Sequence, residues 1–321
     1  MVRTESHGME PDSLVYVAGH RGMVGSALVK ALQNHGFSRL LLEPSSTLDL
    51  SNSQNVDSFF EKQKPDVVLL AAARVGGILA NRTYPAEFIR TNLEIQTNVI
   101  HSSWKHNVKR LLFIASACIY PRLCAQPMKE ESLLTGHLEP TNAAFAMAKL
   151  AGITMCEAYR SQYGVNFSSV IPTNQYGAND NFDPKASHLI GSLVLRFHEA
   201  KLLKKPEVIL WGTGHPRRDF MLVDDLAETI IFLLKHPNLP DPINIGTGKD
   251  LSIAEIAHFV SSAVGYEGKI VFDNNMPDGA PQRLLDVSRL EGLGWGQHTT
   301  LADGLARTYQ WFEQRYAETR L

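Results

Sequence analysis

A glycine-rich motif near the N-terminus is the first feature of the sequence that could do chemistry. The motif Gly19-His20-Arg21-Gly22-Met23-Val24-Gly25 directly follows the apolar run 14–18 and opens a helical pattern that reaches about His35. Glycines at this spacing allow a tight turn, so that backbone N–H groups at the positive end of a helix can approach a pyrophosphate. A glycine pattern alone is a weak signal. The strand before it and the helix after it predict a dinucleotide site.

The residue at the end of the second apolar run bears on the choice of dinucleotide. Glu43 stands there, and a carboxylate at this place accepts hydrogen bonds from the adenosine ribose hydroxyls and repels a 2′-phosphate. The residues that follow supply no cation, so Arg21 is the one candidate partner for such a phosphate. A solvated carboxylate at a strand end is the alternative reading of Glu43. We expect NAD(H) or NADP(H), with Glu43 favouring NAD(H).

The elements that must position this site follow from the alternation of apolar runs with helical stretches. Short apolar runs at 14–18, 39–42, 66–71, 109–116 and 166–171 read as strands of a buried parallel sheet. Amphipathic stretches at about 84–106 and 141–163 read as long helices. Residues 172–184, rich in Asn, Asp, Pro and Gly, read as a loop.

We therefore predict an α/β chain with a Rossmann-type, doubly wound parallel sheet and a smaller mixed α/β lobe. The dinucleotide-binding domain is expected over residues 13–172. The C-terminal lobe, which binds the substrate, is expected over 173–321, with some segments returning to the first domain. Residues 1–12 are polar, without an apolar targeting core, and read as a loose tail of a cytoplasmic protein.

Composition excludes several classes of protein. The chain has 321 residues, a formal charge of −2 and no apolar stretch long enough for a membrane span, so no membrane partner is expected. Its near-neutral charge gives no electrostatic case for a nucleic-acid partner. Three cysteines, none in a C-x-x-C pair, argue against a disulfide framework and a structural zinc, and no metal site is predicted.

Further sequence blocks lie at the ends of the predicted strands and at the start of a predicted helix. They are Ala71-Ala-Ala-Arg-Val-Gly-Gly, Ser116-Ala-Cys-Ile-Tyr-Pro, Phe145-Ala-Met-Ala-Lys149, Pro172-Thr-Asn-Gln-Tyr-Gly, the block 211–220 and the block 281–286. Together with the glycine motif they resemble the GDP-L-fucose synthase family. This family of extended short-chain dehydrogenases/reductases epimerises and then reduces GDP-4-keto-6-deoxy-mannose. The resemblance runs from about Val15 to Phe312.

The resemblance implies epimerisation at sugar carbons 3 and 5 by a cysteine and a histidine, which match Cys118 and His188. Such a step needs a base and an acid on opposite faces of the ring, with the enolate stabilised between them. A thiol and an imidazole have unperturbed pKa values of roughly 8.5 and 6.5, close enough to neutrality to exchange roles. Taken alone, Cys118 would more often be a buried small apolar residue and His188 an ordinary loop histidine.

For reduction at carbon 4, the family uses a serine, a tyrosine and a lysine. Ser116 and Lys149 match the first and last, but Phe145 stands at the tyrosine position and has no exchangeable proton. Ala117 stands in the place of a frequent second hydroxyl, and with Phe145 and Glu43 it makes three departures that all touch the redox half of the site. Asn142-Ala-Ala, in place of Asn-Glu-Pro, is a further departure and favours natural divergence at Phe145. The epimerase residues show none. This asymmetry favours a changed function over drift.

Phe145 leaves several interpretations open. The residue is either an introduced substitution or a natural divergence. The chain then epimerises without reducing, reduces slowly with water, Lys149 or another hydroxyl relaying the proton, or binds cofactor and nucleotide sugar without turnover. Tyr120 and Tyr176 lie in the motif blocks, but nothing in the sequence aims either hydroxyl at the ketone.

Binding of a GDP-sugar calls for guanidinium groups in the C-terminal lobe. By resemblance, the predicted substrate contacts are Asn174, Arg196, Trp211, Arg218 and Arg283, although solvated arginines and a core tryptophan are the alternatives. Small residues after the third strand would let the nicotinamide half lie against the backbone. The predicted cofactor contacts beyond the glycine motif and Glu43 are Asp49, Leu50, Ala71, Ala72, Ala73, Lys149, Pro172 and His188. The resemblance also implies a homodimer through a four-helix bundle, and the two predicted long helices have the length and amphipathicity that such a bundle needs.

Overall fold

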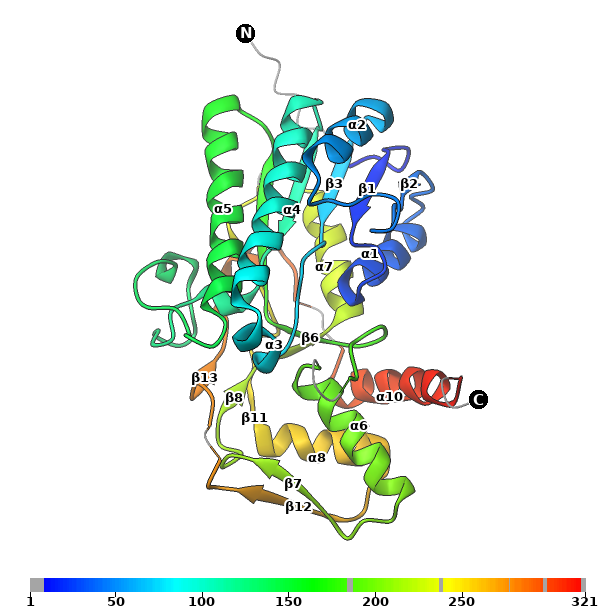
Figure 1. Cartoon of the computed structure of the whole chain (residues 1–321), viewed down its shortest axis with the longest axis vertical. Helices are drawn as coiled ribbons and strands as arrows, with labels where there is room; N and C mark the ends of the chain where they lie inside the picture. Colours follow the sequence, from blue (N-terminus) through cyan, green and yellow to red (C-terminus); the bar gives the residue numbers. More distant parts are fainter. Residues whose placement is uncertain (1–8, 184–186, 237–238, 277, 297–298, 319–321) are drawn as a thin grey trace.

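A six-stranded parallel sheet forms the centre of the N-terminal part of the molecule (Figure 1). The computed structural model describes residues 9–183, 187–236, 239–276, 278–296 and 299–318. The strands run in the order β10-β5-β4-β3-β1-β2, and every pair is parallel. Their bounds are β1 (Val15–Ala18), β2 (Leu40–Leu41), β3 (Val67–Leu70), β4 (Arg110–Ile114), β5 (Phe167–Pro172) and β10 (Ile243–Ile245). This order confirms the predicted Rossmann-type fold.

The strand order reverses between β1 and β3, and this point sets the place of the site. From β1 the chain goes outward to β2, and then returns to add β3, β4 and β5 on the other side. In sheets of this kind ligands bind in the crevice beyond the carboxyl ends of the strands at the reversal. The glycine motif follows β1, and Ala71 to Ala73 follow β3.

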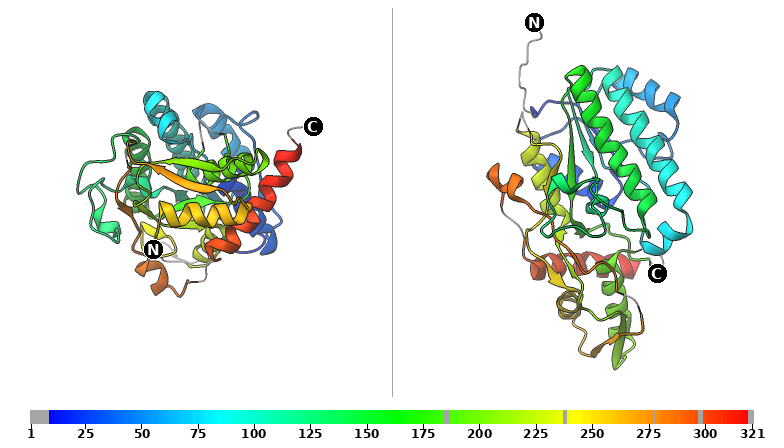
Figure 2. Two further views of the ribbon diagram at one scale, coloured as in Figure 1. Left: turned by 90° about the horizontal axis from the view of Figure 1, so that it is seen from below. Right: turned by 90° about the vertical axis from the view of Figure 1, so that its left-hand side faces the viewer.

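Helices cover both faces of the sheet, as two views at right angles show (Figure 2). The first face carries α2 (Ser53–Gln63), α4 (Pro85–Lys105) and α5 (Ala143–Tyr163), and the second carries α1 (Met23–Asn34) and α7 (Val223–Leu234). Both long helices lie where the sequence predicts them. Pro85 starts α4 with its fixed φ, and Gly164 ends α5 in the left-handed conformation, at φ 68°.

The C-terminal lobe lies beyond the carboxyl ends of the sheet, at the bottom of Figure 1, around a core of its own. Its elements are β6 (Asn174–Tyr176), α6 (Leu189–Leu202), β7 (Glu207–Trp211), β8 (Arg217–Arg218), β9 (Phe220–Leu222), β11 (Leu251–Ser252), α8 (Ile253–Val264), β12 (Lys269–Asp273), β13 (Gln282–Arg283) and α10 (Leu301–Glu318). Short helices are α3 (Ile78–Thr83), η1 (Ala117–Ile119), η2 (Glu130–Ser132) and α9 (Ser288–Gly292). Within residues 173–321, β10 and α7 belong to the first sheet and its helix layers.

One local expectation is wrong. The segment predicted as a loop contains β6, which pairs in parallel with β9, a distant partner that local composition cannot indicate. The loose tail predicted for residues 1–12 lies mostly outside the described residues. Within the described part, Met9 is buried and donates its N–H to the carbonyl oxygen of Leu234. None of the described helices combines the length and the hydropathy that crossing a bilayer needs.

Candidate active site

Two glycines bring the turn after β1 into contact with its surroundings. Gly19 has φ 87°, and a Cβ placed there would lie 2.8 Å from the Cα of Ala72. A Cβ on Gly25 would lie 2.1 Å from the carbonyl oxygen of Gly19. Neither position accepts a side chain, so the glycines hold the start of α1 tightly against the ends of β1 and β3.

The N-terminus of α1 fits the pyrophosphate of a dinucleotide. Gly22 is its N-cap, no side chain caps the helix, and its first turn contains no acidic residue. Backbone N–H groups at this positive end of the helix are therefore available to an anion. Pro172 ends β5, and Ala71 hydrogen-bonds back to Ala18 at 3.1 Å, so small residues line the same edge of the sheet.

Glu43 lies beside the glycine motif. Its carboxylate accepts a hydrogen bond from Thr47 Oγ1 at 2.8 Å, and its charge acts on His20 and Tyr16. Arg21, within the motif, is exposed. Asp49 and Leu50 lie farther along the loop before α2, where Asp49 accepts hydrogen bonds from Ser51, and among the described residues neither is hydrogen-bonded to the glycine motif.

The end of β4 and the first turns of α5 bring Ser116, Cys118 and Lys149 together. Lys149 is buried and its ammonium group donates to the carbonyl oxygen of Ile114 at 2.8 Å. Burial lowers the pKa of Lys149 to about 8, while the charge of a Cys118 thiolate would raise it. Burial raises the pKa of the Cys118 thiol, and a hydrogen bond with Ser116 opposes that effect. The positive charges of Arg283 and Lys149 also favour the thiolate.

Phe145 places an aromatic ring beside Lys149 and no hydroxyl. The ammonium group lies 5.9 Å from the centre of this half-buried ring, whose other neighbour is the ring of Phe88 at 6.4 Å. The two tyrosines of the motif blocks do not supply the missing group. Tyr120 is fully buried and its hydroxyl donates to Asn244, whereas Tyr176 is buried against Gly304 of α10.

Two arginines lie next to this group. Arg218 on β8 and Arg283 on β13 are register partners, and Arg283 also donates to the carbonyl oxygen of Ala117 at 3.4 Å. Burial and the charge of Arg283 lower the pKa of Arg218 to about 10. Asn174 joins the cluster through a hydrogen bond to the carbonyl oxygen of Asp219. Adjacent guanidinium groups of this kind suit a diphosphate.

The structure leaves three predicted residues apart from this cluster. His188 is the N-cap of α6 and is exposed, and desolvation still lowers the pKa of its imidazole. Arg196 is exposed on α6, and no hydrogen bond between described residues joins either one to Cys118. Trp211 is 67 % exposed because it lies on the outward face of the alternating strand β7, so the core role considered for it is wrong.

Two buried carboxylic acids were missed by the sequence reasoning. Asp219 accepts hydrogen bonds from the N–H and hydroxyl of Thr247, and burial raises its pKa to about 6. It fixes the backbone between Arg218 and β9. Asp180 lies in the segment before α6, and burial raises its pKa to about 7. An acidic residue directly before the apolar stretch Phe220–Leu222 was the available signal for Asp219.

Comparison with known proteins agrees with this geometry. Residues 15–246 match the NAD dependent epimerase/dehydratase family. GDP-L-fucose synthase 1 of Arabidopsis thaliana is 52 % identical, covering 93 % of this chain and 92 % of the relative, and GDP-L-fucose synthase of Escherichia coli K12 is 49 % identical, covering 93 % and 96 %. The GDP-mannoheptose C4 reductase of Campylobacter jejuni, solved with NADP bound, superposes with a TM-score of 0.87 at 41 % identity, covering 95 % and 100 %.

The match therefore extends over nearly the whole chain, from the glycine motif to the arginine pair. The chain belongs to the NAD dependent epimerase/dehydratase family and, within it, to the GDP-L-fucose synthases.

Proposed function

We propose that the protein is a GDP-sugar enzyme that epimerises a 4-keto-6-deoxy hexose at carbons 3 and 5 through Cys118 and His188, and that Phe145 slows reduction at carbon 4. The relatives named GDP-L-fucose synthase support the substrate class. The arginine pair beside Cys118 supports a diphosphate-containing substrate. The position of the Phe145 ring beside Lys149, without a hydroxyl to donate a proton, supports slowed reduction.

Epimerisation removes a proton next to the ketone and returns it on the opposite face. Burial raises the pKa of the Cys118 thiol, but the Ser116 hydrogen bond and the cations Arg283 and Lys149 act in the opposite direction and favour the thiolate, which is the form that takes the proton. The lowered pKa of His188 makes its imidazolium the stronger acid, which is the form that returns a proton. The exposure of His188 at the start of α6 leaves it accessible to a substrate held by Arg218 and Arg283.

Reduction at carbon 4 depends on the other half of the site. A bound nicotinamide cofactor supplies the hydride. Ser116 hydrogen-bonds the ketone oxygen, and Lys149 contributes a positive charge near it, but no side chain at position 145 delivers the proton. Loss of one positioned acid costs about 10²- to 10⁴-fold in rate, so reduction is slowed rather than abolished.

The cofactor proposal rests on two opposed charges. Glu43, beside the glycine motif, supports NAD(H), because its carboxylate accepts from a free ribose hydroxyl and repels a phosphate. The NADP of the Campylobacter jejuni reductase supports NADP(H), for which exposed Arg21 is the cation within the motif. We propose NAD(H), and the ratio of kcat/KM for NADH and NADPH tests the choice.

We also propose that the protein is a cytoplasmic homodimer. Helices α4 and α5 pack side by side on the first face of the sheet, and on their side away from the sheet Met147 and Tyr163 of α5 are 47 % and 44 % exposed. A second copy of the same pair would form a four-helix bundle and cover them. The molar mass in solution, with Met147→Glu as the disruptive variant, tests this arrangement.

The experiment that tests the function is exchange of the substrate's protons in heavy water. Cys118→Ser should abolish deuterium incorporation at carbons 3 and 5 of GDP-4-keto-6-deoxy-mannose, whereas Cys124→Ser, which changes a loop thiol outside the cluster, should retain it. Exchange that persists in Cys118→Ser would contradict the proposed role of this thiol.

A further inference from the structure

A buried hydrogen-bond network lies behind the active-site cluster. Its centre is Asn244 on β10, which is fully buried, and its other members are Tyr120, also fully buried, and Glu130, which is 6 % exposed. Tyr120 donates to Asn244 Oδ1 at 2.6 Å. The backbone N–H of Asn244 donates to Glu130 Oε1 at 2.9 Å.

The side-chain amide of Asn244 is bonded through both its N–H donors and its oxygen. Its Nδ2 donates to the carbonyl oxygens of Met128 and Asp286, at 3.0 Å each, while its Oδ1 accepts from Tyr120. The opposite orientation of the amide would set its oxygen against two carbonyl oxygens, so these contacts fix the orientation. Three separate segments of the chain are therefore fastened to one side chain of the central sheet.

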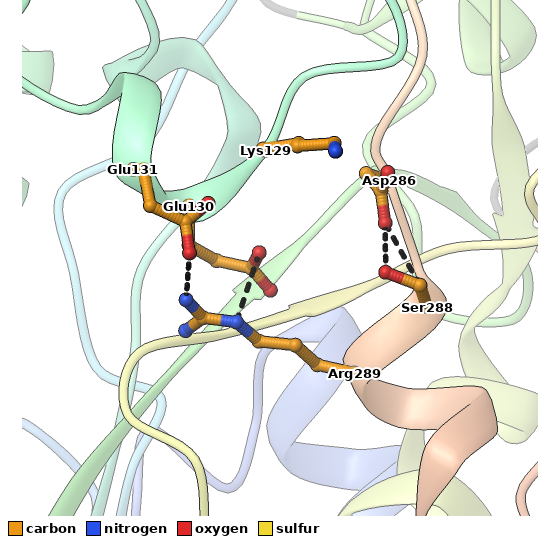
Figure 3. A pocket seen from close by; sticks show the side chains of 6 residues that line it. All are labelled: Lys129, Glu130, Glu131, Asp286, Ser288 and Arg289. Carbon is orange, nitrogen blue, oxygen red and sulfur yellow. Dashed lines mark hydrogen bonds and ion pairs between the residues drawn. The ribbon is translucent and has the colours of Figure 1, made fainter.

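Figure 3 shows the outer end of the network, where charged side chains line a pocket. Arg289 forms ion pairs with Glu130, at 3.4 Å, and with Glu131, and it donates to the carbonyl oxygen of Pro242 at 2.9 Å. Asp286 accepts from the N–H and hydroxyl of Ser288. Glu130 thus receives one bond from the sheet and one ion pair from α9, which holds its carboxylate in a single place.

Two of the fastened segments lead directly to predicted site residues. Tyr120 follows η1, the short helix that contains Cys118. The segment that ends at Asp286 contains Arg283 and pairs with the segment around Met128. The N–H of Met128 donates to the carbonyl oxygen of Leu284 at 2.7 Å, and the N–H of Asp286 donates to the carbonyl oxygen of Met128 at 2.9 Å. Arg283 in turn donates to the carbonyl oxygen of Ala117. The network therefore anchors the two segments that carry the Cys118 thiol and the Arg283 guanidinium group.

We propose that Tyr120, Asn244 and Glu130 are positioning residues that hold Cys118 and Arg283 in register with each other across the substrate site. The proposal rests on the proposed function, since it takes Cys118 as the epimerase thiol. The three residues touch neither reacting atom. They act by keeping η1 and β13 at a fixed separation, and a displacement of about 1 Å of a reacting group can cost about 100-fold in rate.

Tyr120→Phe is the sharpest variant, because it removes one hydroxyl and keeps the ring. We expect kcat for deuterium exchange to fall about 10- to 100-fold, with a smaller change in KM. Tyr266→Phe is the matched control: it removes a hydroxyl bonded to the carbonyl oxygen of Lys205 in the other lobe, and it should leave kcat at the parent value. Glu130→Gln keeps an acceptor for Asn244 and should retain activity, whereas Glu130→Ala should lose it. Retained exchange in both Tyr120→Phe and Glu130→Ala would overturn the proposal.

A second readout separates this proposal from the proposed function. If the parent protein shows no exchange, the assigned activity fails, and the alkylation rate of Cys118 by iodoacetamide, followed by peptide mass spectrometry, still reports the position of η1. A change of about threefold or more in Tyr120→Phe, with none in Tyr266→Phe, supports the network. Equal alkylation rates in the parent and in Tyr120→Phe overturn it.

Discussion

Restoring a hydroxyl at position 145 tests the link between this residue and reduction. Phe145→Tyr adds one oxygen to a half-buried ring in the first turn of α5, so its edge contact with Phe88 is retained. The free energy of unfolding should change by about 0.5 kcal/mol or less. Any large change in rate is then an effect on chemistry rather than on folding.

The expected magnitude follows from the charge of Lys149. The ammonium group lies 5.9 Å from the centre of the Phe145 ring. With the charge of a phenolate placed at the ring centre and an effective dielectric constant of about 20, the ammonium group would stabilise it by up to roughly 3 kcal/mol. This energy corresponds to about two pKa units, so it would lower the pKa of a tyrosine at position 145 from about 10 to about 8. Such an acid can donate at neutral pH, and we expect reduction to rise about 10²- to 10⁴-fold.

The pH dependence of the gain has a definite sign. Burial lowers the pKa of Lys149 to about 8, so its positive charge is present below this pH and is lost above it. The gain in Phe145→Tyr should therefore be largest below about pH 8 and should shrink as the lysine loses its proton.

Reduction is measured by the loss of reduced-nicotinamide absorbance, and exchange at carbons 3 and 5 is measured in parallel. Exchange should stay within about twofold of the parent, because Cys118 and His188 do not depend on position 145. Phe232→Tyr, a partly buried ring on the opposite face of the sheet, is the matched control and should leave both rates unchanged. Unchanged reduction in Phe145→Tyr, with exchange intact, would show that a hydroxyl at position 145 does not control the reduction rate.

Three other predictions concern the cofactor, the buried acid and the arginine pair. Glu43→Arg should shift the ratio of kcat/KM from NADH toward NADPH by about tenfold or more, because a cation replaces a carboxylate at the ribose; an unchanged ratio would place Glu43 outside the site. In the folded chain the Asp180 carboxyl has a pKa of about 7, so the folded state holds a proton that the unfolded state releases, and stability falls as the pH rises from about 4 to 7. Asp180→Asn should remove this loss and raise the unfolding free energy by up to about 4 kcal/mol at pH 8, with a smaller gain at pH 5, in urea titrations. Arg283→Met should raise KM for the GDP-sugar about 10-fold or more, whereas Arg196→Met, on the exposed face of α6, serves as the comparison; equal KM values in parent and Arg283→Met would exclude a diphosphate contact.

The sheet and its long helices could be predicted because their signals are local. The apolar run Val67–Leu70 has the length and composition of a buried strand, and α4 begins at Pro85 with a helical period that extends to Lys105. The glycine motif was equally readable, because the crowding at Gly19 and Gly25 leaves room for no other residue type. The glycine spacing of this motif is visible in consecutive residues, although part of the crowding that requires Gly19 comes from Ala72 after β3.

Features formed by distant partners could not be predicted in this way. Strand β6 depends on β9, more than 40 positions later, and Tyr120 depends on Asn244, 124 positions later. An asparagine between two isoleucines of a buried strand signals that some polar partner exists, but it does not name the partner. Trp211 was ambiguous for the same reason, since the alternation of β7 shows which residues share a face but not which face is covered.

The most direct test of the central claim is one incubation of the purified protein with GDP-4-keto-6-deoxy-mannose in heavy water, with NADH or NADPH, followed by NMR of the products. We expect deuterium at carbons 3 and 5 early in the reaction, with the ketone at carbon 4 still present and reduction far slower than exchange. Reduction that keeps pace with exchange would contradict the role given to Phe145, and the absence of deuterium at both carbons would contradict the role given to Cys118 and His188.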